Sequence, residues 1–277
     1  MPRTRRHQLD RPDATIAYWT AGRPADPAVV LLHGATLDHR AWDPQTDALA
    51  HRCHVVVPDL RGHGASTGRF DYRAAVADVL ALLDRLPAER VVLVGLSLGG
   101  NIAQDVVHRE PDRVLALVGA DTTCNTASRH PLAGPMAVAA VRAQAMSPGD
   151  GFARQAARVT ANDPRVQQYA LETNAHRTNG ETVHILSSLL TTAFRADPGY
   201  RLPVPTLLVH GELDRIGDIA SAMPAWARRE PRARYAVVPG AGHASNLDNP
   251  EGFTALLEDF LDDVLPDEVL GERAEQR

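Results

Sequence analysis

Short apolar runs recur along the chain, and glycine, proline or aspartate bounds most of them. Short runs of valine, leucine and alanine predict β-strands. Because these runs are continuously apolar rather than alternating, both faces of each strand are expected to be covered, as in a parallel sheet between helices. Residues 14–20 alternate weakly instead, which is typical of an antiparallel strand. The continuous runs are residues 28–32, 53–57, 91–94, 114–118, 206–209 and 235–238.

Amphipathic segments separate these runs. Residues 71–86 carry a stripe of valine and leucine at helical spacing, and Pro87 ends the pattern. Residues 98–109 and 251–265 show further helical patterns. Strands that alternate with helices predict an α/β domain with a mostly parallel, doubly wound sheet.

Residues 123–201 break this alternation. They contain no convincing strand, and prolines interrupt their alanine- and arginine-rich helical stretches. A helical insertion between two strands fits this pattern, and such an insertion would roof a pocket. We therefore expect a core domain formed by residues 1–122 and 202–277, and a helical cap formed by residues 123–201.

Composition narrows the class of protein. The chain has 277 residues, of which 44% are hydrophobic and 23% charged, an ordinary globular composition. A formal charge of −5 gives no electrostatic reason to expect nucleic acid or an anionic membrane as a partner. Cys53 and Cys124 have no metal-ligand spacing. The charged N-terminal residues lack the apolar core of a signal peptide, so a cytoplasmic protein is expected. The pattern does not indicate an oligomeric state.

The segment VVLVGLSLGG, residues 91–100, carries the first chemical signal. An apolar run leads into a turn in which Ser97 lies between Gly95 and Gly99, and Gly100 follows. On a tight strand-to-helix turn a serine oxygen is exposed above the sheet edge, and the glycines remove side chains that would crowd it. Since a serine hydroxyl is a poor nucleophile without a nearby base, this pattern predicts partners elsewhere in the chain.

Candidate partners follow two later strands. Asp214 lies in HGELD, after residues 206–209, and His243 lies in PGAGH, after residues 235–238. The chain order Ser97, Asp214, His243 is that of one known arrangement of the catalytic triad. Asp121, which follows residues 114–118, is the alternative acid. These residues predict nucleophilic catalysis by serine.

Attack by a serine on a carbonyl creates an oxyanion, which needs hydrogen-bond donors. We expect one donor to be the backbone N–H of Leu98, directly after the nucleophile. The second is expected from the loop that follows residues 28–32, where Gly34 permits a sharp turn. The N–H of Ala35 is the predicted donor there, with that of Thr36 as the alternative.

Five segments resemble the motifs of the α/β-hydrolase superfamily, in the order that the superfamily has them. The resemblance implies an α/β-hydrolase fold with a helical cap and the triad named above. Within the superfamily, the chain is similar to small carboxylesterases and 3-oxoadipate enol-lactonase-like proteins, although carbon–carbon bond hydrolases and perhydrolases share these motifs. The segments are LLHGAT at 31–36, PDLRGHGAS at 58–66, GLSLGG at 95–100, HGELD at 210–214 and GAGHASNLDNPEGF at 240–253.

The expected activity is hydrolysis of a carboxylic ester or lactone of a small molecule, without a metal or an organic cofactor. A carbon–carbon bond hydrolase, a thioesterase or a perhydrolase would use the same triad. A non-catalytic ligand-binding protein of the same fold is the alternative of another class. The candidate substrate-binding residues are Thr36, Thr122, Met136, Met146 and His184.

Overall fold

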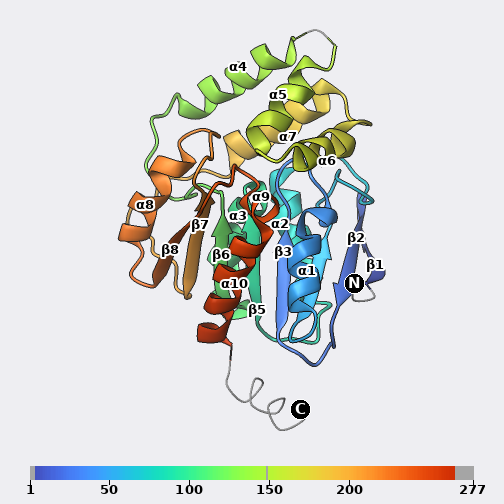
Figure 1. The fold of residues 1–277 in the computed structure, drawn as a ribbon, viewed down its shortest axis with the longest axis vertical. Helices are drawn as coiled ribbons and strands as arrows, with labels where there is room; N and C mark the ends of the chain where they lie inside the picture. The colour runs from blue at the N-terminus through green and yellow to red at the C-terminus, as the bar shows by residue number, and fades with distance from the viewer. Residues whose placement is uncertain (1–3, 148, 266–277) are drawn as a thin grey trace.

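The computed structural model describes residues 4–265 except Pro148, and it contains one mixed sheet (Figure 1). Its strands lie in the order β1-β2-β4-β3-β5-β6-β7-β8. The crossovers that this order requires place helices on both faces, so the predicted doubly wound sheet is confirmed. The strands are β1 (Arg5–Arg11), β2 (Ala14–Ala21), β3 (Ala28–Leu32), β4 (His54–Pro58), β5 (Val91–Leu96), β6 (Val114–Ala120), β7 (Thr206–Gly211) and β8 (Ala233–Val238).

Within the described residues, β2 runs opposite to the other strands of the sheet. The pairs β1–β2 and β2–β4 are antiparallel, and the pairs from β4 to β8 are parallel. The antiparallel strand expected at residues 14–20 is therefore confirmed as β2. The pattern does not predict β1, because its sequence RRHQLDR is almost entirely polar and exposed, as an edge strand can be.

Two apolar cores flank the sheet. On one face, α1 (Asp43–Leu49) and α10 (Pro250–Val264) pack against side chains of β3 to β7. On the other face lie α2 (Tyr72–Leu83), α3 (Leu98–Arg109) and α8 (Ile219–Arg229). The fully buried residues of β3, β4 and β5 between these layers explain the continuous apolar runs. Shorter elements are η1 (His39–Trp42), η2 (Pro111–Arg113) and α9 (Ser245–Asp248).

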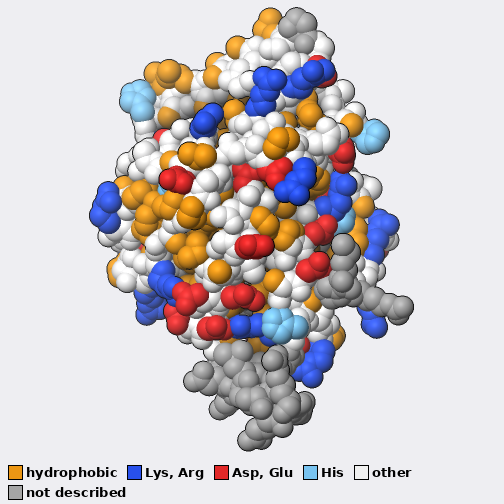
Figure 2. Space-filling model, in the orientation of Figure 1, with side chains coloured by type: hydrophobic (Ala, Val, Ile, Leu, Met, Phe, Trp, Pro, Cys, Tyr) orange, Lys and Arg blue, Asp and Glu red, His pale blue; other side chains and the backbone are white. Residues whose placement is uncertain are grey.

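Among the described residues, four helices lie between β6 and β7 in the chain, and they gather at one end of the sheet (Figure 1). We call residues 123–201 the cap. On the face drawn in Figure 2, acidic and basic side chains are intermingled. None of the helices in the described part of the chain combines the length and the apolar character needed to cross a bilayer. The cap helices are α4 (Ala133–Ala145), α5 (Gly151–Thr160), α6 (Pro164–Asn174) and α7 (Asn179–Thr192).

Candidate active site

Ser97 occupies a strained turn between β5 and α3. Its φ of 52° and ψ of −114° lie outside the regions that non-glycine residues ordinarily adopt. Two hydrogen bonds fix the backbone there: the Ser97 N–H donates to the Ala120 carbonyl over 2.8 Å, and the Thr122 hydroxyl donates to the Ser97 carbonyl over 2.8 Å. Strain of this kind persists only where the surroundings determine it, and it is concentrated at functional sites.

The glycines around Ser97 are sterically required. A Cβ on Gly95 would lie 2.4 Å from the backbone of Gly99 and Gly100. A Cβ on Gly99 would lie 2.2 Å from the Leu32 carbonyl oxygen, and one on Gly100 would lie 2.7 Å from the Thr122 side chain. The expectation that these glycines clear space around the serine is therefore confirmed.

His243 is buried and paired with Asp214. Its Nδ1–H donates to Oδ2 of Asp214 over 3.0 Å, and the backbone N–H of Ile216 donates to Oδ1 of the same carboxylate over 2.8 Å. Burial opposes protonation of the imidazole. The hydrogen bond and charge of Asp214, together with the charge of Asp121, outweigh burial and raise the pKa of His243 above its ordinary value.

Asp121 is a second carboxyl group beside this pair. Its nearest ligand atom lies within 4.8 Å of those of Asp214 and His243. The backbone N–H of Gly211 donates to its Oδ1 over 2.7 Å, and the Ser245 hydroxyl donates to its Oδ2 over 2.5 Å. Burial raises the pKa of Asp121 to about 7; the charge of His243 works against burial and that of Asp214 adds to it. Both acids that the sequence indicated thus lie near His243, and it is Asp214 that bonds to the ring.

Hydrogen bonds through Asp121 also connect the segments that carry these residues. The Asp121 backbone N–H donates to the Val209 carbonyl over 2.8 Å, while its side chain holds Gly211 and Ser245. Since Ser97 bonds to Ala120, one continuous set of contacts runs from the ends of β5, β6 and β7 to the segment that contains His243. The structure therefore ties together backbone segments that are far apart in sequence.

The loop after β3 lies directly beside the serine. A Cβ on Gly34 would lie 3.5 Å from the Ser97 Cβ. The buried His33 ring shapes this loop, because its Nδ1–H donates to the Gly34 carbonyl over 2.8 Å while its Nε2 accepts from the Leu60 N–H over 2.9 Å. In a trans peptide the N–H points opposite to the C=O. The bond to the Gly34 carbonyl therefore sets the direction of the Ala35 N–H.

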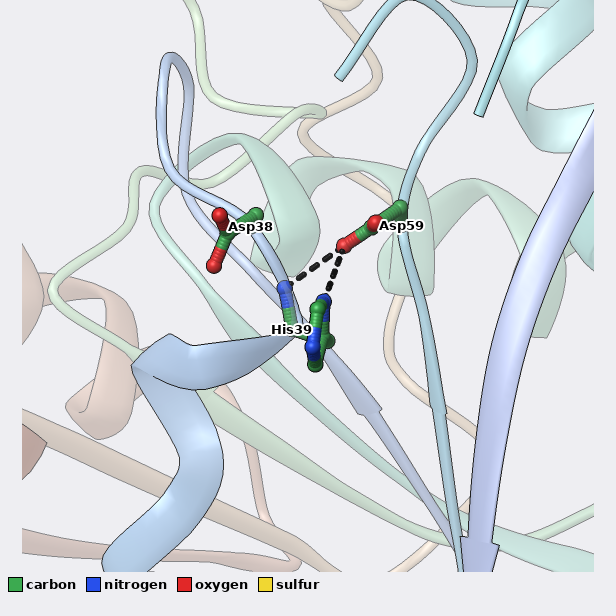
Figure 3. Close-up of side chains that lie close together, drawn as sticks. All are labelled: Asp38, His39 and Asp59. Atoms are coloured by element: carbon green, nitrogen blue, oxygen red, sulfur yellow. Dashed lines mark hydrogen bonds and ion pairs between the residues drawn. The ribbon is translucent and has the colours of Figure 1, made fainter. Parts of the chain in front are cut away.

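Asp38, His39 and Asp59 form a further cluster in the adjoining loops (Figure 3). Oδ1 of Asp59 accepts from the backbone N–H of His39 over 2.7 Å and from its ring Nδ1–H over 2.9 Å. Oδ2 of Asp59 accepts from the Ala65 N–H over 2.7 Å. The Asp38 carboxylate is engaged separately by the Arg40 guanidinium. These carboxylates are already bound by N–H donors, so the cluster serves to join two loops.

The predicted pocket residues have different surroundings. Met136 lies on α4 and Met146 directly follows it, and they expose 67% and 83% of their surface. His184 uses both ring nitrogens in contacts with the core, one to the Phe70 carbonyl and one to the Arg69 guanidinium. Thr122 is buried and directs its hydroxyl to the Ser97 carbonyl.

Thr36 lies in the loop after β3, with a φ of 64°, and its carbonyl accepts from the Asn174 side chain of the cap. Thr36 is therefore a predicted pocket residue that lies in the loop beside Ser97. The sequence pattern gave no signal for contacts of this kind between loop and cap, because they join segments more than a hundred residues apart.

Comparison with known proteins places this geometry in a family. Residues 29–256 match the alpha/beta hydrolase family, and the chain belongs to it. It is 33% identical to a pimeloyl-[acyl-carrier protein] methyl ester esterase of Aromatoleum aromaticum, over 85% of this chain and 98% of that protein. It is 27% identical to a putative non-heme chloroperoxidase of Synechocystis, over 90% of this chain and 96% of that protein.

Solved structures agree on the fold. A thermophilic esterase from Thermogutta terrifontis superimposes with a TM-score of 0.79 at 25% identity, covering 95% of this chain and all 100% of that one. The enol-lactonase from Burkholderia xenovorans LB400 gives a TM-score of 0.78 at 23% identity, covering 92% and 100%. The resemblance to the α/β-hydrolase superfamily in the sequence motifs is thereby confirmed.

Proposed function

We propose that this chain is a serine hydrolase that cleaves a carboxylic ester or lactone of a small molecule. The observation that carries the proposal is the hydrogen bond of 3.0 Å from buried His243 to Asp214. Contacts through Asp121 connect the segments that hold these two residues to the strained turn at Ser97. A base held by a carboxylate and within reach of a serine is the arrangement that activates a hydroxyl for acyl transfer.

In the proposed mechanism, His243 accepts the proton of the Ser97 hydroxyl as the oxygen attacks the ester carbonyl. Asp214 holds the tautomer of the ring in which Nε2 is free to accept, and it stabilises the imidazolium that forms. The backbone N–H groups of Leu98 and Ala35 donate to the oxyanion. His243 then gives its proton to the leaving alcohol and activates a water that releases the acid from the enzyme.

The relatives suggest which esters to try first. The esterase of Aromatoleum aromaticum is named for a methyl ester of an acyl chain, so methyl esters of carboxylic acids lead the panel of substrates. Lactones follow, because the neighbour from Burkholderia xenovorans is an enol-lactonase. Acyl thioesters, vinylogous diketones and peracid formation test the thioesterase, carbon–carbon hydrolase and perhydrolase alternatives on the same triad.

The decisive experiment compares the wild-type chain with Ser97→Ala, both purified from a host strain with a low esterase background. We expect turnover of at least one ester or lactone, and a loss of nearly all of it in the variant. A fluorophosphonate probe should label wild-type Ser97 and leave the variant unlabelled. Wild-type activity in Ser97→Ala would refute the assignment, and an unlabelled, inactive but ligand-binding wild type would favour the binding-protein alternative.

A further inference from the structure

The cap is divided between the two cores of the molecule. Side chains of α5 and α6 pack in the core that contains α1 and α10. Side chains of α7 pack in the opposite core, with α2 and α3. We call residues 151–174, which hold α5 and α6, the cap hairpin. This hairpin is therefore continuous with the layer of the core that also carries the segment around His243.

The cap hairpin holds the backbone on both sides of His243. The Ala244 N–H donates to the Thr160 carbonyl at the end of α5 over 2.7 Å. On the other side, the Gly242 N–H donates to Oδ2 of Asp248 over 2.7 Å. We call residues 240–248 the histidine loop. The N–H groups of the residues on both sides of the proposed base are thus bonded, one to Asp248 and one to the cap hairpin.

Asp248 joins the histidine loop to the cap hairpin. Besides Gly242, its Oδ2 accepts from the Asn162 N–H over 2.7 Å, and its Oδ1 accepts from the Asp163 N–H over 3.0 Å. Asn162 and Asp163 form the turn between α5 and α6. The Asp248 carboxylate therefore accepts hydrogen bonds from N–H groups of both the histidine loop and the cap hairpin. Each of these N–H groups needs an acceptor oxygen.

The packing at Gly242 shows how closely the two segments approach. A Cβ at this position would lie 3.0 Å from Oδ2 of Asp248 and 3.4 Å from the Ala161 Cα of the cap hairpin. Because the glycine lacks a side chain, the hairpin can rest against the residue that precedes His243.

The cap hairpin also holds the loop that carries the proposed oxyanion donor, residues 33–38, which we call the oxyanion loop. The Tyr169 hydroxyl on α6 donates to Oδ1 of Asp38 over 3.0 Å and accepts from the Asp38 N–H over 3.3 Å. The Asn174 side chain donates to the carbonyl of Thr36, whose φ of 64° is strained for a threonine. The hairpin thus contacts both loops that the proposed reaction uses.

We propose that the cap hairpin is a fixed part of the catalytic apparatus, with Asp248 and Tyr169 as the positioning residues that hold the histidine loop and the oxyanion loop. This inference rests on the proposed function. A misplacement of reacting groups by about 1 Å costs about 100-fold in rate, so the effect should fall on kcat.

The test uses Asp248→Asn and Tyr169→Phe in the full chain, with Ser188→Ala as the matched control. The Ser188 hydroxyl on α7 accepts from the Tyr72 N–H over 3.0 Å, so the control removes a cap-to-core bond that touches neither loop. Asparagine at 248 keeps the shape but turns an NH₂ group toward N–H donors. We expect kcat to fall about 10- to 100-fold in Asp248→Asn and about 10-fold in Tyr169→Phe, with KM within about twofold.

Amide hydrogen exchange supplies a readout that does not depend on turnover. We expect the amides of Gly242 and Ala244 to exchange about tenfold faster in Asp248→Asn, with the wild-type rate kept in Ser188→Ala. In Tyr169→Phe the amide of Asp38 should lose protection instead. If Asp248→Asn does not fold, Tyr169→Phe carries the test alone.

The proposal is overturned if both variants match Ser188→Ala in kcat and in exchange, or if they raise KM with kcat unchanged, because that would assign the residues to substrate binding. Failure of the proposed function has a different signature. The wild-type chain itself would then show neither hydrolysis dependent on Ser97 nor labelling of Ser97, whatever the exchange rates of the variants.

Discussion

The imidazole of His243 donates to Asp214 over 3.0 Å, while Asp121, whose carboxylate lies within 4.8 Å of both, bonds to Gly211 and Ser245 instead. The two acids therefore have different tasks in the structure. Asp214 orients the ring, and Asp121 holds the backbone segments around it. This difference gives each acid its own expected mutational effect.

Replacement of the orienting acid should be far more damaging than replacement of its neighbour. In Asp214→Asn the amide can present an NH₂ group to Nδ1 and so favour the wrong tautomer, and we expect kcat/KM to fall about 10³- to 10⁴-fold. Asp121→Asn keeps an acceptor oxygen for Gly211 or Ser245 and should lose about tenfold at most. Steady-state kinetics on the best ester of the panel measures both.

The opposite order of activity losses in these two variants would contradict the assignment of Asp214 as the acid that orients His243. If Asp121→Asn lost more activity than Asp214→Asn, the acid that serves the histidine would be the one after β6. Thermal unfolding of both variants is the control, because each removes a buried carboxylate and a folding defect must be separated from a catalytic one.

The pH dependence of activity should report both buried groups. In the proposed mechanism His243 must be neutral to accept a proton, and its pKa is raised, so activity should be lost as pH falls through a value above the ordinary 6.5 of histidine. Asp121, with a pKa raised to about 7, takes up a proton in the same range. Since protonation of either group lowers the proton affinity of the other, we expect the acid limb of kcat/KM against pH to be shallower than a one-proton titration.

Removal of the Asp121 charge tests this coupling. The negative charge of Asp121 helps to raise the pKa of His243, so Asp121→Asn should lower it. The acid limb would then move to lower pH and take the slope of a single proton. Profiles recorded at constant ionic strength for wild type and variant check the expectation, which an unshifted limb would contradict.

Much of this site could be predicted from the sequence because its residues follow continuous apolar runs. Such runs mark parallel strands, buried in β5 and β7 but largely exposed in the edge strand β8. Because the carboxyl ends of parallel strands meet at one edge, the sequence predicts that Ser97, Asp214 and His243 converge there. The glycines around Ser97 predict a tight turn, because side chains there would be crowded. The structure agrees, since a Cβ on Gly95 or Gly99 would lie too close to neighbouring backbone atoms.

The features of the fold and site that the sequence does not predict depend on packing between distant segments. No local pattern distinguishes Met136 and Met146 as exposed, because alanine-rich α4 is nearly as apolar on its outer face as on its inner one. The strand β1 escapes prediction because an edge strand of polar residues has no apolar run. Asp248 shows its role only when the cap hairpin is placed beside it.

The His33 ring should prove necessary for the oxyanion loop. In His33→Leu the Gly34 carbonyl loses the donor that directs the Ala35 N–H, and the buried Leu60 N–H loses its acceptor. We expect kcat to fall about 10- to 100-fold, as for loss of an oxyanion donor, and stability to fall by about 1–3 kcal/mol. Kinetics and urea unfolding measure the two effects.

His54 provides a matched control for this substitution. It is buried on β4, and within the described residues its Nδ1 has no hydrogen-bond partner. His54→Leu should therefore leave kcat unchanged. Equal kcat losses in the two variants would mean that His33 acts through general packing rather than through the loop.

A final prediction concerns the stability of the core rather than the reaction. Arg61 and Asp78 form a buried ion pair, with side chains only 3% and 5% exposed and Nε 2.6 Å from Oδ2. Arg61 also pairs with Asp13 over 3.0 Å, but the Asp13 side chain is 68% exposed. Asp78→Ala therefore leaves the buried guanidinium with one solvated partner and should lower the free energy of unfolding by about 1–3 kcal/mol. Replacement of both partners, in Arg61→Met with Asp78→Leu, should restore most of that loss, because no charge remains to be buried. Asp150→Ala, which breaks an exposed pair with Arg154, should leave the urea midpoint unchanged. If Asp78→Ala unfolded at the wild-type urea concentration, Asp13 alone would suffice as the partner of Arg61, and the pair with Asp78 would not stabilise this part of the core.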